Sequence, residues 1–167
     1  MSARTVIDNL EFSRRGALLE GVVAVADLGR LQDSLLSSQG VLNYTLSGKT
    51  GAKGEALLVC GMEGMLVLQC QRCLEAMEYP LRIVSTLKLV ADVTEFDDLG
   101  EEDESVDSIP VSAAMDVLAL IEEEILLNLP LAPLHPPGAC GEPDAAMRAR
   151  QEKTNPFEAL AALKGKL

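Results

Sequence analysis

Two cysteines separated by two residues carry the clearest chemical signal in this 167-residue chain. Cys70 and Cys73 follow the apolar run 65–69 and precede a second strand-like stretch, so they are expected on a turn. Thiols at this spacing can share one zinc ion or oxidise to a disulfide. Three interpretations follow: reduced thiols on a hairpin turn, a metal site, or a redox-active pair.

A metal site needs two further ligands, and the remaining candidates outside the expected core are His135 and Cys140. Both fall in the Pro/Gly-rich segment 133–140, so half of the site would be local in sequence and half would depend on the fold. Zinc is the cofactor that this ligand set suggests. A redox pair usually opens a helix, whose N-terminus stabilises the thiolate, whereas this pair lies between two strands. Cys60 shares one strand face with Leu58 and Met62 and is predicted to be a core thiol.

The rest of the sequence offers little support for catalysis. No Gly-rich phosphate loop follows a strand and opens a helix, so nucleotide binding is not expected. His135 is the only histidine, and a catalytic role for it would require a geometry that the sequence does not specify. We therefore predict no catalytic residues. The acidic run Glu122, Glu123 and Glu124 is predicted to be a solvated helix face.

The charge balance limits the kinds of partner. The chain has 14 basic and 26 acidic residues, and its net charge is −12. Nucleic-acid binders owe much of their affinity to Lys and Arg, so direct RNA binding by the isolated chain is not expected, and neither is binding to an anionic membrane. No apolar run approaches the ~20 residues of a membrane span, and the N-terminus has no hydrophobic signal region. We expect a cytoplasmic protein of unknown oligomeric state.

The sequence also predicts the helices and strands that position these residues, and together they indicate an α+β fold. Alternating apolar residues indicate strands near 22–26, 42–46, 55–62, 65–70 and 75–93, with residues 61–64 as a turn. Short connections favour a mainly antiparallel, strongly twisted sheet or a partly closed barrel. A short helix is expected over 28–36, capped by Asp27. One long amphipathic helix is predicted from Ala113 to about Leu127, with Ser112 as its cap and Pro130 as its stop.

Residues 1–140 are predicted to form a single domain, in which 95–107 is an acidic mobile loop. Residues 141–167 would be a polar tether and a short C-terminal helix, which starts at the capping sequence 155–158. About nine residues are too few for a stable isolated helix. Its apolar face therefore needs a partner surface, and we predict partner binding by Phe157, Leu160 and Leu163.

The order of these motifs resembles the YceD family, the large-ribosomal-RNA-subunit accumulation proteins of bacteria and plastids. The resemblance rests on the strand end 68–74, the acidic loop, the helix end 123–130, the segment 133–140 and the C-terminal motif 155–164. It implies a cytosolic accessory protein that supports accumulation, processing or stability of 23S ribosomal RNA. It brings no catalytic residues with it.

Two hypotheses of different classes remain at this point. The first is a non-enzymatic factor in ribosome biogenesis that binds a ribosomal protein or a large-subunit assembly intermediate, because an acidic chain can attract a basic partner. The alternative is a small thiol oxidoreductase or metal-dependent enzyme that uses the Cys70–Cys73 pair.

Overall fold

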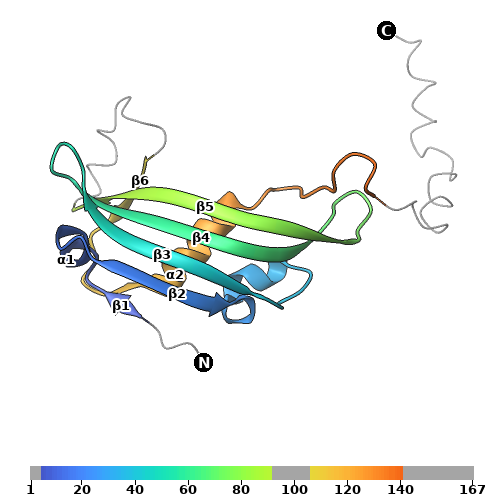
Figure 1. Ribbon diagram of the computed structural model, residues 1–167, viewed down its shortest axis with the longest axis horizontal. Helices are drawn as coiled ribbons and strands as arrows, with labels where there is room; N and C mark the ends of the chain where they lie inside the picture. Colours follow the sequence, from blue (N-terminus) through green and yellow to red (C-terminus); the bar gives the residue numbers. More distant parts are fainter. Residues whose placement is uncertain (1–4, 92–105, 141–167) are drawn as a thin grey trace, which may run out of the picture.

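The computed structural model describes residues 5–91 and 106–140, and a five-stranded sheet forms its centre (Figure 1). The strand order is β2-β3-β4-β5-β6. The first four strands are antiparallel neighbours, whereas β6 runs parallel to β5. The strands are β2 (Leu18–Ala24), β3 (Val41–Thr50), β4 (Ala56–Gln69), β5 (Ala76–Val90) and β6 (Val106–Pro110).

The remaining elements cover one face of this sheet or flank its ends. Helix α2 lies across the sheet, and α1 lies at the end opposite the β4–β5 turn (Figure 1). A separate two-stranded ribbon pairs β1 with β7. The elements are β1 (Val6–Ile7), α1 (Asn9–Arg14), the 3₁₀ helices η1 (Val25–Asp27) and η2 (Gly29–Ser34), β7 (Met115–Asp116) and α2 (Val117–Asn128).

The core forms where alternate residues of the long strands meet α2 and η2. On β4, residues 58, 60, 62, 66 and 68 are buried, and on β5 residues 81, 83, 87 and 89 are buried in the same way. Ile121 and Ile125 of α2 and Leu31 of η2 complete this layer. The opposite face of the sheet leaves apolar side chains such as Val84 exposed. The period-two pattern of a half-buried sheet is therefore confirmed.

The prediction of mixed α and β content is confirmed, but the alternative of a partly closed barrel is wrong. The sheet is open, with β2 and β6 as its two edges, and the parallel β5–β6 pair makes it mixed. A parallel pair needs a long crossover connection, and the segment between β5 and β6 was predicted only as an acidic loop. Residues 106 and 107 of the predicted loop 95–107 belong to β6.

The long amphipathic helix is not found as predicted. Helix α2 begins at Val117, and its cap is Asp116, whose side chain accepts hydrogen bonds from the backbone N–H groups of Leu118 and Ala119. The residues before it pair with β1 instead of extending the helix. The predicted solvated face is confirmed only for Glu123, whose side chain is 60% exposed, and is wrong for Glu122 and Glu124, which are 8% and 4% exposed. The helix therefore has no single apolar stripe.

Two other local predictions are corrected by the strand register. Residues 61–64 do not turn, because β4 runs through them and pairs continuously with β3 and β5. Gly64 serves close packing there, since a Cβ atom at this position would lie 2.4 Å from Leu42 Cδ2. The helix expected over 28–36 is the shorter 3₁₀ helix η2, and Asp27 does not cap it.

Several predictions fall outside the described residues. These are the loop residues 95–105, the tether from 141 and the C-terminal helix with its apolar face. Among the residues that are described, no helix has both the length and the apolar character needed to cross a membrane.

Candidate metal centre

The turn between β4 and β5 presents the first two candidate ligands. Cys70 directly follows β4, and its backbone N–H donates to the Glu75 carbonyl over 3.0 Å. The Leu74 N–H returns to the Cys70 carbonyl at 2.8 Å, and Leu74 adopts a left-handed backbone conformation with φ 63°. These two bonds close the turn tightly, so that Cys70 and Cys73 lie on it at fixed positions.

The other two candidate ligands arrive on the chain that follows α2. This segment reaches the β4–β5 turn at one end of the sheet (Figure 1). The backbone N–H of Gln71 donates to the Pro133 carbonyl at 2.9 Å, and the Arg72 guanidinium donates to the His135 carbonyl at 2.8 Å. Two residues between the cysteines therefore fix the segment that carries His135 and Cys140.

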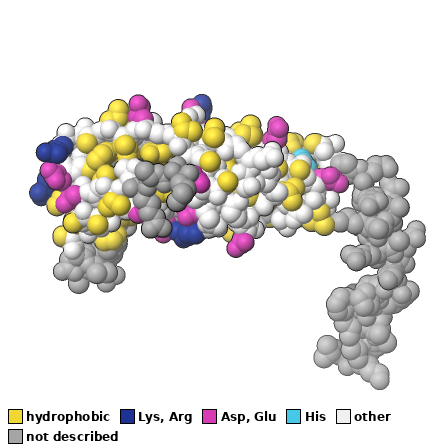
Figure 2. Space-filling model, turned by 90° about the horizontal axis from the view of Figure 1, so that it is seen from below, with side chains coloured by type: hydrophobic (Ala, Val, Ile, Leu, Met, Phe, Trp, Pro, Cys, Tyr) yellow, Lys and Arg dark blue, Asp and Glu magenta, His cyan; other side chains and the backbone are white. Residues whose placement is uncertain are grey.

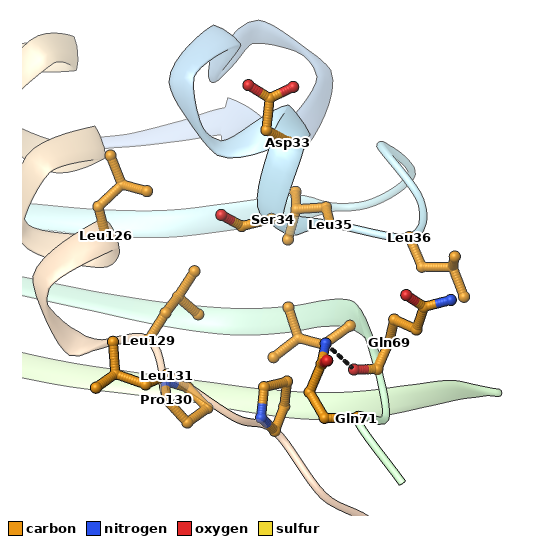
Figure 3. Close-up of a pocket in the computed structure, with 12 residues that line it drawn as sticks. Asp33, Ser34, Leu35, Leu36, Gln69, Gln71, Leu126, Leu129, Pro130 and Leu131 are labelled. Atoms are coloured by element: carbon orange, nitrogen blue, oxygen red, sulfur yellow. Dashed lines mark hydrogen bonds between the residues drawn. The ribbon is translucent and has the colours of Figure 1, made fainter. Parts of the chain in front are cut away.

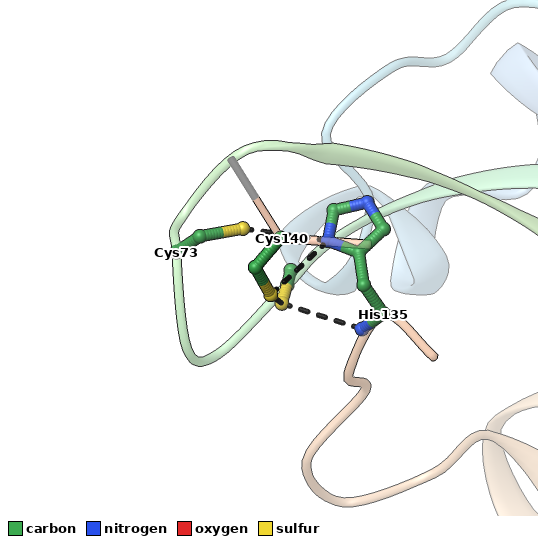
Figure 4. Close-up of side chains that lie close together, drawn as sticks. Cys73, His135 and Cys140 are labelled. Atoms are coloured by element: carbon green, nitrogen blue, oxygen red, sulfur yellow. Dashed lines mark hydrogen bonds between the residues drawn. The ribbon is translucent and has the colours of Figure 1, made fainter. Parts of the chain in front are cut away.

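The structure brings all four predicted ligands together, and Figure 4 labels three of them, Cys73, His135 and Cys140. The ligand atoms of Cys70, Cys73, His135 and Cys140 all lie within 4.8 Å of one another. The Sγ atoms of Cys70 and Cys140 are 3.8 Å apart, and His135 Nδ1 lies 3.3 Å from Cys73 Sγ and 3.8 Å from Cys140 Sγ. Sulfurs bound to one tetrahedral zinc at about 2.3 Å would be separated by about 3.8 Å. This group could therefore bind a metal ion, and its geometry is compatible with zinc.

The second nitrogen of His135 supports this arrangement. Nε2 lies 3.2 Å from the Ala76 carbonyl oxygen, to which it can donate when it carries the proton. That tautomer leaves Nδ1 without a proton, at 3.3 Å from the Cys73 sulfur and 3.8 Å from the Cys140 sulfur. Metal-binding histidines commonly use their other ring N–H in this way, and the partner fixes both the tautomer and the orientation of the ring.

The surroundings also favour a thiolate at Cys70. Burial would raise the pKa of this thiol, but hydrogen bonds from the backbone N–H groups of Cys73, His135 and Arg72 outweigh burial and lower the pKa to about 5. In Cys140, burial and the contacts with the thiols of Cys73 and Cys70 raise the pKa to about 11. The cluster thus combines one thiolate with a neighbouring thiol, and a bound cation would favour loss of further protons.

Cys60 stands apart from the cluster, as the sequence predicted. It is fully buried on β4, and burial, together with the negative charge of Glu124, raises the pKa of its thiol to about 12. The contacts of Arg72 and Gln71 with the segment 133–135 were not predicted. They involve backbone carbonyl groups, which leave no signature in a sequence.

A groove adjoins the cluster on the side of α2 and η2 (Figure 3). Its volume is about 360 Å³, and Gln71 lies both in its lining and beside the cluster. Leucines from three segments supply most of its apolar surface: Leu35, Leu36, Leu68, Leu126, Leu129 and Leu131.

Comparison with known proteins agrees with the order of motifs in the chain. Residues 58–164 match the family described as large ribosomal RNA subunit accumulation protein YceD, a stretch that includes β4, the cysteine turn and the segment 133–140. The chain belongs to this family. A Haemophilus influenzae protein with the same description is 28% identical over 167 residues, which cover 96% of this chain and 95% of that relative. No solved structure matches the chain.

Proposed function

We propose that this protein is a non-enzymatic accessory factor in ribosome biogenesis that supports synthesis, processing or stability of 23S ribosomal RNA in the cytoplasm. The family match over residues 58–164 carries this proposal, because the family is named for accumulation of the large-subunit RNA. The relative from Haemophilus influenzae has the same name and aligns over almost its whole length. The cysteine cluster then has a structural role.

The charge of the chain favours action through protein contacts. With a net charge of −12, the isolated protein repels phosphate groups and attracts basic proteins. On the face drawn in Figure 2, the Lys and Arg side chains of the described residues lie in small separate groups and do not form a continuous basic surface. The proposed partner is a ribosomal protein or a large-subunit assembly intermediate.

We propose further that the cluster binds one structural zinc ion through Cys70, Cys73, His135 and Cys140. Four protein ligands close a tetrahedral site and leave no position for a substrate, as is usual for structural zinc. The ion would join the β4–β5 turn to the segment after α2. Thiol oxidoreductase chemistry is less well supported, because Cys70 is completely buried and the pair does not open a helix.

The metal proposal is tested by elemental analysis of the full chain purified without added metal. We expect about one zinc per chain, and a large loss of zinc in the Cys73→Ser and His135→Ala variants. The matched control is Cys60→Ala, which removes a buried cysteine from the core and should retain the ion. Zinc below a tenth of an equivalent in the wild-type protein would contradict the proposal.

The functional proposal is tested in cells that lack the gene. We expect 23S ribosomal RNA to fall relative to 16S ribosomal RNA and to recover when the wild-type chain is supplied. Capture of the tagged protein at low and moderate salt, with and without ribonuclease, separates protein from RNA contacts. Retention of ribosomal proteins after ribonuclease treatment supports protein contacts, whereas complete loss of the captured material would indicate an RNA-mediated association.

The apolar face of Phe157, Leu160 and Leu163 is proposed to contact the partner. In Phe157→Ala, we expect lost association with large-subunit precursors and an unchanged melting temperature. Ala162→Ser changes another position of the same segment and serves as the control. A clear fall in the melting temperature of Phe157→Ala would instead assign this face to the protein's own core, where a buried Phe is worth ~3–5 kcal/mol.

A further inference from the structure

A second cavity lies away from the cysteine cluster, between β6, β5 and helix α2. Its volume is about 550 Å³, and its apolar surface includes Leu87 of β5, Ile109 of β6 and Leu120 of α2. The ionisable residues that line it are all acidic within the described part of the chain: Asp107, Asp116, Glu123 and Glu124. An apolar interior with only carboxylates around it matches a ligand that combines an aliphatic body with a positive charge.

Glu124 is the unusual member of this lining. Its residue is only 4% exposed, yet no hydrogen bond or ion pair to its carboxylate is formed within residues 5–91 and 106–140. Glu122, on the same helix, differs from Glu124 because its carboxylate accepts hydrogen bonds from the backbone N–H groups of Arg30 and Leu31. Among the described residues, only Ser85 and Ser108 have a fully buried side-chain oxygen or nitrogen without a partner, so the Glu124 carboxylate keeps contact with the cavity, where a cation can reach it.

A neighbouring hydroxyl group is also without a partner. The Oγ atom of Ser108, which lines the cavity from β6, is buried and makes no hydrogen bond in the described part of the protein. Glu123 lies at the cavity as well, and is 60% exposed with an ion pair to Arg30 at 3.9 Å. The cavity is therefore lined by the Glu124 carboxylate, which has no partner among the described residues, by Ser108, whose hydroxyl oxygen makes no hydrogen bond, and by the exposed carboxylate of Glu123, which pairs with Arg30.

We propose that this cavity binds a lysine or arginine side chain from a protein partner. The cation pairs with Glu124, the Ser108 hydroxyl accepts a hydrogen bond from it, and the aliphatic stem packs on Leu87, Ile109 and Leu120. The net charge of −12 steers such a basic segment towards the protein. This inference rests on the proposed function only in placing the partner among basic ribosomal proteins.

The test uses the ¹⁵N-labelled full chain and two short peptides, acetyl-Ala-Leu-Arg-Leu-Ala-amide and its citrulline analogue. Citrulline has nearly the shape of arginine but carries no charge. We expect saturable shifts of the amide signals of β6 and the second half of α2, with about tenfold weaker binding of the citrulline peptide. Glu124→Gln should lower arginine-peptide affinity to that of the citrulline peptide. Glu20→Gln, on the opposite edge strand β2, makes the same charge change and should leave the affinity unaltered.

The melting temperature of the free protein provides an independent test. Glu124→Gln removes one of four neighbouring carboxylates at nearly constant shape, so the melting temperature should equal or exceed that of the wild type because like charges then repel less. Equal binding of the two peptides, shifts confined to other elements, or unchanged affinity in Glu124→Gln would each overturn the proposal. The same shifts produced by Mg²⁺ or Ca²⁺ alone would overturn it in favour of a metal site. Failure of the proposed function would be recognised separately, by normal 23S ribosomal RNA in cells without the gene.

Discussion

Cys60 and Cys70 belong to the same stretch of chain, and neither is exposed to solvent, yet their surroundings have opposite effects. Cys60 lies within β4 among apolar side chains, and its pKa is raised to about 12. Cys70 follows the end of β4, and its sulfur accepts hydrogen bonds from backbone N–H groups. These hydrogen bonds lower the pKa of its thiol to about 5. Burial alone therefore does not decide the state of a cysteine. The polarity of the neighbouring groups decides it.

The two cysteines mark two regions that are ordered by different forces. The core region, around Cys60, is held by apolar burial between the sheet, α2 and η2. The cluster region, made of residues 70–76 and 133–140, is held by hydrogen bonds and, in our proposal, by a metal ion. A perturbation that acts on one of these forces should therefore disturb one region and largely spare the other.

The largest expected effect is loss of the ion from the cluster region. In Cys73→Ser, we expect zinc affinity to fall by more than the roughly 10–100-fold that loss of an outer-shell partner costs. The Gln71 and His135 amides, which donate to Pro133 O and Cys70 Sγ, should then lose their protection from hydrogen exchange. Amides in the centre of β4 should stay protected, because their region does not depend on the ion.

Cys60→Ala provides the reverse case for the same measurement. It removes a thiol from the core region, so it should reduce global stability while zinc content and protection at Gln71 stay at their wild-type values. Equal loss of protection in both regions in the Cys73→Ser variant would show that the two regions unfold as one unit and that the distinction is wrong.

A smaller effect is expected from a change of packing in the core region. At Gly48 of β3, a Cβ atom would lie 2.4 Å from the Phe12 carbonyl oxygen and 2.6 Å from Ser13 Cα. Both atoms belong to the backbone of α1 and cannot move aside easily. Gly48→Ala should therefore reduce the free energy of unfolding by about 1–3 kcal/mol. The expected zinc content is unchanged. Urea unfolding and elemental analysis together check this prediction.

Gly29→Ala is the matched control for this substitution. A Cβ atom at Gly29 would meet nothing within 4 Å, and its backbone is not in the left-handed region. Its free energy of unfolding should therefore stay close to the wild-type value. Similar destabilisation by the two variants would mean that loss of glycine itself, and not contact with α1, causes the effect.

The two regions also differ in how far the sequence predicted them. The alternation of apolar residues in β4 and β5 specified which side chains face the core, and Cys60 was placed there correctly. The four ligand candidates could be named from residue type and spacing, although their approach depends on Gln71 and Arg72 binding backbone carbonyls of 133–135. A sequence shows the type of each side chain, whereas it does not show which backbone carbonyl groups will accept hydrogen bonds from distant residues.

The incorrect predictions within the sheet and in α2 share a physical cause. The turn predicted at residues 61–64 is wrong, because Gly61 and Gly64 lie within β4 and leave room for the side chains of Thr45 and Leu42 on the neighbouring strand. The prediction that Glu122 is solvated is wrong, because η2 donates two backbone N–H groups to its carboxylate, a contact that sequence periodicity does not reveal. Long-range contacts overrode local preference in both cases.

The smallest expected effect concerns the alkaline stability of the core region. The thiol of Cys60 titrates at about 12 in the folded protein instead of its ordinary value of 9.0. The folded state therefore holds this proton more tightly than the unfolded chain, and the associated stability is fully present below pH 9 and lost as the pH rises towards 12. Cys60→Ala should remove this dependence, so the stability difference between wild type and variant should shrink over that interval. Other groups titrate there in both proteins, and only the difference between the two curves isolates Cys60. A constant difference from pH 8 to 11 would show that the thiol ionises as readily in the folded core as in the unfolded chain, and the electrostatic contrast between the two regions would then be lost.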